Sequence, residues 1–117
     1  MALPQPQTIA VNGVNLCYFE WGQADAPVIV CLHSHTAHAG IWDEFGPYMS
    51  DAYHVYALDQ RGHGDSSWAD GSYDRDRYVE DLTAFMEALS IKKAILVGAS
   101  MGGWNSLLYT AANPDAI

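Results

Sequence analysis

The sequence predicts an α/β fold in which a β-hairpin is followed by largely parallel strands that alternate with helices. Two β-rich runs within residues 8–22 are joined by Asn12-Gly13, the strongest short signal for a hairpin. Short apolar runs then recur along the chain, separated by segments with helical spacing. Such alternation is typical of a sheet whose parallel strands are covered by helices.

The three strands after the hairpin are expected at residues 28–33, 54–58 and 94–98. Each run is continuously apolar instead of alternating, which favours a strand that is buried on both faces. Residues 59–71 are rich in Gly, Asp and Ser, so this segment is expected to be a loop.

Helices are expected between and after these strands. Residues 74–89 carry the clearest pattern, with apolar side chains at i, i+4, i+7, i+8 and i+11. Residues 101–112 form a second predicted helix, which Asn113-Pro114 ends. A short amphipathic helix is also expected before residue 50, weakened by Gly46-Pro47, with an apolar face made of Ile41, Trp42, Phe45 and Met49.

Composition places the chain among globular proteins of at most one domain, with 117 residues of which half are hydrophobic. The net charge of −9 argues against nucleic acid and anionic membranes as partners. No apolar run approaches the roughly 18 residues of a membrane span, and the first residues lack a signal peptide's features. We therefore expect a cytoplasmic protein, with Cys17 and Cys31 as buried thiols.

Ser100 is the residue with the strongest chemical signal. It lies between a predicted strand and a predicted helix, in the stretch Gly-Ala-Ser-Met-Gly-Gly of residues 98–103. A sharp strand-to-helix turn presents a serine hydroxyl as a nucleophile, and such a turn requires small residues two positions before and after the serine. Gly98 and Gly102 meet this requirement, so we predict a left-handed backbone at Ser100 with an exposed Oγ. The competing interpretation is a simple helix cap.

These residues resemble the nucleophile elbow of the α/β-hydrolase fold superfamily. Residues 32–42, LHSHTAHAGIW, are similar to the family's Leu-His-Gly segment, and residues 59–66, DQRGHGDS, are similar to its Asp-x-Arg-Gly-x-Gly-x-Ser loop. The resemblance covers residues 8–116 but only the N-terminal half of the family's domain. It implies that residues 1–117 are a partial domain whose C-terminal strands are missing.

The family's order of catalytic residues explains why no histidine follows Ser100. The triad runs Ser, then Asp or Glu, then His along the chain, whereas all five histidines here precede the serine. The resemblance therefore places the acid and the base in sequence that is absent. By the same resemblance, the backbone N–H groups of His35 and Met101 form the oxyanion hole. Ser34 stands where the family usually has Gly, which puts the geometry of that loop in question.

The histidines allow two other interpretations. His35 could act as a substitute base for Ser100. His33, His35 and His38 also resemble the first zinc motif of metallo-β-lactamase-type hydrolases, although that family has Asp where Ala37 stands. On the preferred interpretation no metal or cofactor is implied. Arg61 and Asp59 are either substrate contacts or parts of a structural turn, and the tryptophans Trp42, Trp68 and Trp104 belong either to the core or to a pocket wall.

The resemblance implies a serine hydrolase that acts on a small-molecule ester, lactone or similar acyl substrate through Ser100. Cofactor-free peroxidase-type relatives share the serine triad, whereas the haloalkane dehalogenase and epoxide hydrolase branches use Asp as the nucleophile. The alternative is a non-catalytic fragment or binding protein with the same fold. The family's strand order would leave residues 94–98 at an unprotected sheet edge, so self-association through that edge is also expected.

Overall fold

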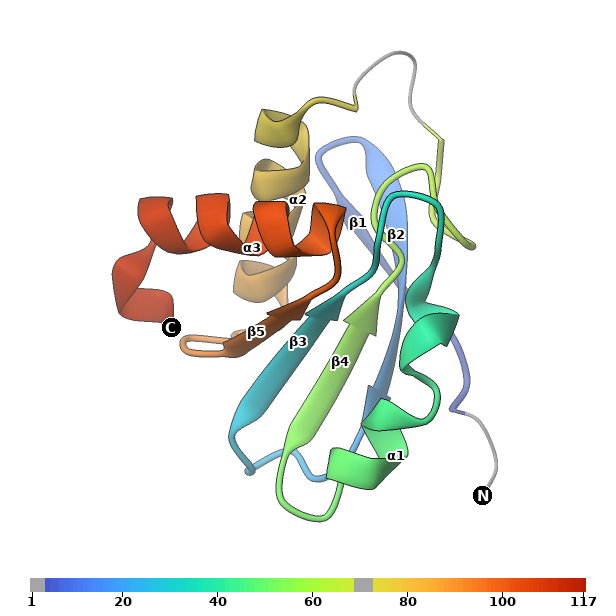
Figure 1. Cartoon of the computed structure of the whole chain (residues 1–117), viewed down its shortest axis with the longest axis vertical. Coiled ribbons are helices and arrows are strands. Elements are labelled where there is room, and N and C mark those ends of the chain that lie inside the picture. The colour runs from blue at the N-terminus through green and yellow to red at the C-terminus, as the bar shows by residue number, and fades with distance from the viewer. Residues whose placement is uncertain (1–3, 69–72) are drawn as a thin grey trace.

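The computed structural model describes residues 4–68 and 73–117 and contains one mixed five-stranded sheet with helices on both faces (Figure 1). The last residues of the predicted loop 59–71 therefore lie outside the described residues. The strands are β1 (Gln7–Val11), β2 (Val14–Trp21), β3 (Val28–Leu32), β4 (His54–Leu58) and β5 (Ile95–Gly98). The helices are η1 (Ala39–Trp42), α1 (Phe45–Met49), α2 (Arg75–Ala88), α3 (Met101–Ala112) and η2 (Pro114–Ala116).

The strand order is β1-β2-β4-β3-β5. β1 and β2 form the predicted hairpin, and Asn12 and Gly13 both have positive φ, as a tight two-residue turn requires. β2 pairs antiparallel with β4, while β3 pairs parallel with both β4 and β5. The predicted hairpin followed by three parallel strands is thus confirmed, with β5 at the edge as expected.

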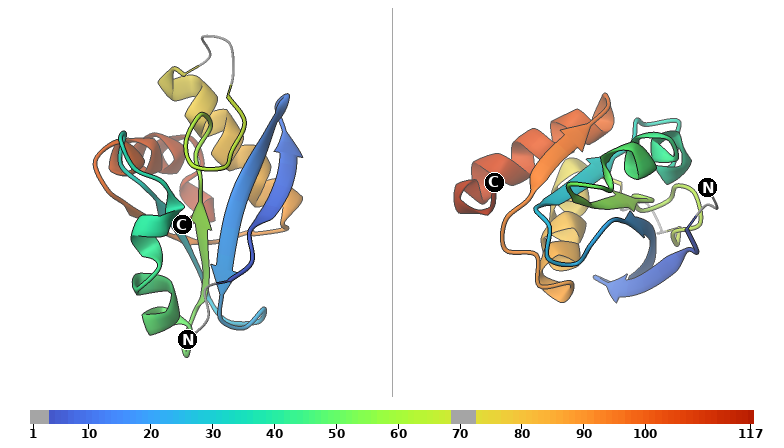
Figure 2. Two further views of the ribbon diagram at one scale, coloured as in Figure 1. Left: turned by 90° about the vertical axis from the view of Figure 1, so that its right-hand side faces the viewer. Right: turned by 90° about the horizontal axis from the view of Figure 1, so that it is seen from below.

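Each face of the sheet has its own core, and Figure 2 shows the helices on opposite sides of it. α2 and α3 cover one face, where Leu82, Phe85 and Tyr109 pack against β-strand side chains such as Leu16 and Val30. The elements η1 and α1 cover the other face, around the buried side chains of Trp21, Ile29, Cys31, Val55 and Ala57. Because β3 and β4 are covered on both faces, their side chains are almost completely buried, as their continuous apolar sequences predict.

Two predictions about elements were wrong in part. The amphipathic helix expected before residue 50 is divided into η1 and α1, and Ile41 is 48% exposed instead of facing the core. The His38 side chain accepts a hydrogen bond from the Gly40 backbone N–H and so begins a separate 3₁₀ turn. The strand β5 is also not buried, and Ile95 is 47% exposed, because this strand has a neighbour on one side only.

Both cysteines are buried free thiols, as the sequence predicts. Burial raises the pKa of the Cys17 thiol to about 11 and that of Cys31 to about 12, so both stay protonated and unreactive at neutral pH. Within the described ranges, no helix combines the length and apolarity that crossing a bilayer would require.

Candidate functional site

Ser100 lies at the junction between β5 and α3, with a backbone conformation that L-residues rarely adopt. Its φ is 52° and its ψ is −110°, and the residue is exposed. The predicted left-handed backbone at this serine is therefore confirmed. α3 begins at the next residue, Met101, so the N-terminal end of its dipole and its unpaired N–H groups lie at the serine.

The two glycines of the turn are required by close backbone approach. A Cβ atom on Gly98 would collide with the backbone of Gly102 and Gly103, and a Cβ on Gly102 would collide with the carbonyl of Leu32. The start of α3 therefore lies directly against the end of β3. This contact places the serine beside the loop that follows β3.

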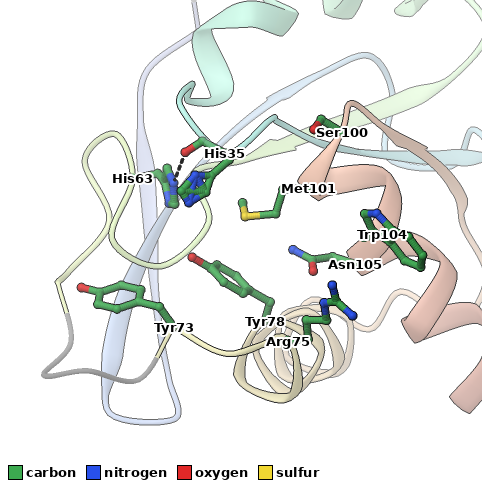
Figure 3. Close-up of a pocket in the computed structure, with 9 residues that line it drawn as sticks. All are labelled: His35, His63, Tyr73, Arg75, Tyr78, Ser100, Met101, Trp104 and Asn105. Carbon is green, nitrogen blue, oxygen red and sulfur yellow. Dashed lines mark hydrogen bonds between the residues drawn. The ribbon is translucent and has the colours of Figure 1, made fainter.

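A cleft of about 600 Å³ opens in front of Ser100. Figure 3 shows residues from four segments around it: the loop after β3, the loop after β4, the start of α2 and the start of α3. Among the described residues, none that lines the cleft is Asp or Glu, although the chain has 14 acidic residues. The lining residues are His35, His63, Tyr73, Arg75, Tyr78, Ser100, Met101, Trp104 and Asn105.

Both residues expected to supply the oxyanion hole, His35 and Met101, line this cleft. Among the described residues, neither the His35 N–H nor the Met101 N–H donates a hydrogen bond within the protein. Ser34 does not have a positive φ, so a serine is accommodated there without backbone strain. Oxyanion stabilisation needs backbone N–H groups that are free to donate, and the role of these two groups in catalysis stays a prediction.

The loop carrying His35 is held in place by His63. The ring nitrogen Nε2 of His63 lies 2.7 Å from the carbonyl oxygen of His35, and Nδ1 lies 2.9 Å from the carbonyl oxygen of Arg61. His63 therefore joins the loop after β3 to the loop after β4. The dashed line in Figure 3 marks its contact with His35.

A buried polar network joins these two loops to α3. The Gln60 backbone N–H donates to Nε2 of His33 at 2.9 Å, and the Gln60 side-chain amide donates to the His33 carbonyl at 2.9 Å. The Asn105 amide donates to Oε1 of Gln60 at 2.7 Å. Since Nε2 of His33 accepts a hydrogen bond, its proton lies on Nδ1, which donates to the Ser34 carbonyl.

This network contradicts the zinc interpretation of His33, His35 and His38. Both ring nitrogens of His33 already have hydrogen-bond partners, and burial lowers the pKa of this imidazole, which keeps it neutral. His38 uses Nδ1 to accept from the Gly40 N–H. His33 is therefore a structural residue of the core and has no lone pair free for a metal.

Arg61 and Asp59 belong to a structural turn, in agreement with the structural alternative. Arg61 is 3% exposed, and its guanidinium donates to both carboxylate oxygens of Asp81 at 2.7 and 2.9 Å. The Asp59 oxygens accept from the backbone N–H groups of Ala39 and Asp65. The carboxylates of Asp81 and Asp59 therefore already accept hydrogen bonds from other residues of the protein. In the described ranges, one cluster of metal-ligand atoms gathers at Cys17, Asp59 and Asp65.

No imidazole is hydrogen-bonded to Ser100 Oγ among the described residues. The His35 ring lies instead beside the ring of His63, with ring centroids 6.1 Å apart. In the view of Figure 3 these two rings gather on one side of the cleft and Ser100 lies on the other. The substitute-base interpretation of His35 therefore gains no support from the hydrogen bonds of the site.

Several lining residues could not be identified from the sequence. Arg75 and Tyr78 begin a helix that is far from Ser100 along the chain, and only the packing of α2 beside α3 brings them to the cleft. Asn105 lies in an ordinary helical pattern, and its burial and its hydrogen bond to Gln60 become visible only in the structure. Trp104 is a wall of the cleft, Trp42 is half-buried in the core, and Trp68 is exposed.

Comparison with known proteins adds independent information about this site. Residues 27–117 match the model of the alpha/beta hydrolase fold family. A bifunctional esterase/perhydrolase from Acinetobacter calcoaceticus is 35% identical over 89% of this chain and 38% of its own length. A 3-oxoadipate enol-lactonase from Acinetobacter baylyi is 36% identical over 82% of this chain and 36% of its own length.

A solved structure with the same arrangement is a haloalkane dehalogenase variant from Bradyrhizobium elkanii. It is 29% identical, has a TM-score of 0.94, and is matched over 99% of this chain and 38% of its own length. The chain thus spans less than two fifths of the length of each of these proteins. Residues 27–117, which the family model matches, include all the residues that line the cleft described above.

Proposed function

The chain belongs to the α/β-hydrolase fold family, and from this premise we propose that Ser100 is the nucleophile of a serine hydrolase for carboxylic esters, lactones or related acyl compounds. The observation that carries this proposal is the left-handed backbone of an exposed serine at the N-terminus of α3. Such a backbone is costly, by roughly 1–3 kcal/mol, and is retained where the position of the side chain matters. A helix cap would not require it, and Ser100 makes no side-chain capping hydrogen bond.

In the proposed reaction, Ser100 Oγ attacks the carbonyl carbon of the substrate while its proton passes to a base. The carbonyl oxygen becomes an oxyanion, which the N–H groups of His35 and Met101 stabilise. Collapse of this tetrahedral intermediate expels the alcohol, which takes up the proton, and leaves an acyl-serine. Water then attacks the acyl group and releases the acid. One oxyanion donor of this kind contributes roughly 3–4 kcal/mol to a working enzyme.

We propose that the base and the acid of the triad come from sequence that follows residue 117 in the gene product. The family's order places both after the serine, and the relatives are more than twice as long as this chain. We propose esters and lactones as the substrates because two relatives are an esterase and an enol-lactonase. The dehalogenase relative belongs to a branch with an Asp nucleophile, and the residue here is Ser100.

The test is hydrolysis of p-nitrophenyl esters by the gene product that contains these residues. Ser100→Ala is expected to lower turnover by roughly 10⁴–10⁶-fold. Ser106→Ala is the matched control, because this serine lies in the same helix and donates only to the Gly102 carbonyl. Turnover that survives in the Ser100→Ala variant would contradict the proposal.

The 117-residue chain by itself is expected to hydrolyse these esters little above background, because no imidazole among its described residues is hydrogen-bonded to Ser100. Fast turnover by this chain, abolished by Ser100→Ala, would instead locate a base within it. His35 would then be the first residue to substitute.

A further inference from the structure

The cleft of Ser100 is also lined by a cationic side chain, that of Arg75. Arg75 is the first residue of α2, and its guanidinium carbon lies 5.2 Å from the centre of the Trp104 ring, in cation–π contact. Both residues line the cleft of Ser100 (Figure 3). A guanidinium held over an aromatic face keeps N–H donors at its edge, where they match the two oxygens of a carboxylate.

The surroundings leave this guanidinium available. Among the described residues, Arg75 forms no salt bridge, whereas Arg61 pairs with Asp81 and Arg77 pairs with Glu80. The neighbouring carboxylate of Asp74 accepts from the Arg77 backbone N–H. Of the described residues that line the cleft, Arg75 therefore carries the one permanent positive charge and none is acidic, whereas the whole chain has a net charge of −9.

We infer that Arg75 and Trp104 form a carboxylate subsite that selects acyl substrates with an anionic end remote from the scissile bond. This inference rests on the proposed function and names its substrate class. Trp104 lies one helical turn after Ser100, a rise of about 6 Å, so the guanidinium stands on the order of 10 Å from the serine. The matching substrate is an ester whose free carboxylate is separated from the reacting carbonyl by several methylene groups.

The experiment compares two ligands that differ by one charge, monomethyl suberate and dimethyl suberate. Their binding to the gene product that contains these residues, with Ser100→Ala in every sample to prevent turnover, is measured by calorimetry. The monoester is expected to bind about three- to tenfold more tightly than the diester. This preference is expected to weaken as the salt concentration rises, because the subsite is exposed to solvent.

Substitutions of Arg75 test whether this residue causes the preference for the monoester. Arg75→Gln is expected to abolish it, and Arg75→Lys to retain part of it through the charge alone. Arg77→Gln is the matched control, since this arginine lies on the same helix and outside the cleft lining. Circular dichroism and thermal melting of each variant verify that the fold is intact.

Equal affinity for the two ligands, no binding of the monoester, or an unchanged preference in Arg75→Gln would each overturn the inference. Its failure is distinguishable from failure of the proposed function. A binding preference that depends on Arg75 without Ser100-dependent hydrolysis contradicts the function alone, whereas hydrolysis without the preference contradicts the subsite alone.

Discussion

Gly102 lets α3 begin directly against the end of β3 because it has no side chain. Its Cα faces the carbonyl groups of Leu32 and His33, at the point where β3 ends. The adjacent Gly103 has a different environment, because a Cβ there would meet its nearest neighbour, the Gly98 carbonyl, at 3.6 Å, an ordinary contact distance. Two consecutive glycines in one helix turn thus have opposite tolerance for a methyl group.

We predict that Gly102→Ala lowers the free energy of unfolding by roughly 1–3 kcal/mol, because the backbone must shift to relieve the overlap. Gly103→Ala is expected to leave it unchanged or to raise it by about 0.5–1 kcal/mol, since alanine favours the helix. Urea denaturation of both variants measures the difference. Equal effects of the two substitutions would show that the turn has more room than the structure gives it.

At the scale of elements, a polar cluster joins β1, β2 and β4. Glu20 on β2 pairs in register with Tyr56 on β4, which places His54 diagonally on the same face. Nε2 of His54 lies 2.7 Å from one Glu20 carboxylate oxygen, and the Gln7 amide donates to the other at 2.6 Å. Burial alone would raise the pKa of Glu20, but the hydrogen bonds from Gln7 and His54, together with the charge of His54, hold it below 4.5.

This cluster predicts an acid-sensitive contribution to stability. A carboxyl group whose pKa is lower in the folded state stabilises the fold above its ordinary value near 4.5, and the contribution is lost as the pH falls through the lowered value. We expect Glu20→Gln to lower stability at neutral pH and to reduce the loss of stability on acidification. Denaturation at pH values on both sides of 4.5 measures this effect.

Glu80→Gln is the control, because both side chains of the Glu80–Arg77 pair are exposed and exposed ion pairs contribute little to the stability of the fold. A Glu20→Gln variant whose stability falls with acid as steeply as that of the unsubstituted chain would contradict the prediction.

The elements that the sequence predicts well are those with local signals. Asn12-Gly13 determines the hairpin through the turn that it forms, and the helix predicted at 101–112 coincides with α3 (Met101–Ala112) because an elbow precedes it and Asn113-Pro114 ends it. The exposure of β5 depends on which strands neighbour it, which no local pattern contains. The same applies to the link between Asn105 and Gln60, residues that are 45 positions apart. The unusual backbone at Ser100 could be predicted in advance, whereas the position of Arg75 at the cleft could not, because it depends on how two helices pack.

For the molecule as a whole, the edge of the sheet at β5 is the most consequential surface. A shallow apolar depression beside it is lined by Ile95, Leu107 and Ile117, each of which is 45% or more exposed. The strand carries no charge and no proline, the devices that normally protect an edge from pairing with another chain. We propose that this surface mediates self-association of the isolated chain.

We predict that light scattering will detect oligomers of the 117-residue chain, and that Ile95→Lys will shift the population towards monomers by placing a charge on this edge. Thr8→Lys is the matched control, because it adds the same charge to the exposed face of β1, the strand at the opposite edge. A monodisperse monomer at all concentrations, or equal effects of the two substitutions, would rule out the β5 edge as the site of association.

The interior position of β3 in the sheet also has a consequence for how the chain is made. Both neighbours of this strand, β4 and β5, come later in the sequence. Ribosomes add roughly 5–20 residues per second, so several seconds separate the synthesis of Leu32 from that of Gly98. During that interval one of the most apolar segments of the nascent chain, Val28–Leu32, lacks the neighbouring strand β5 and is exposed along that edge. Synthesis speed and chaperone access in this window are therefore expected to limit the yield of folded protein more strongly than the stability of the finished sheet does.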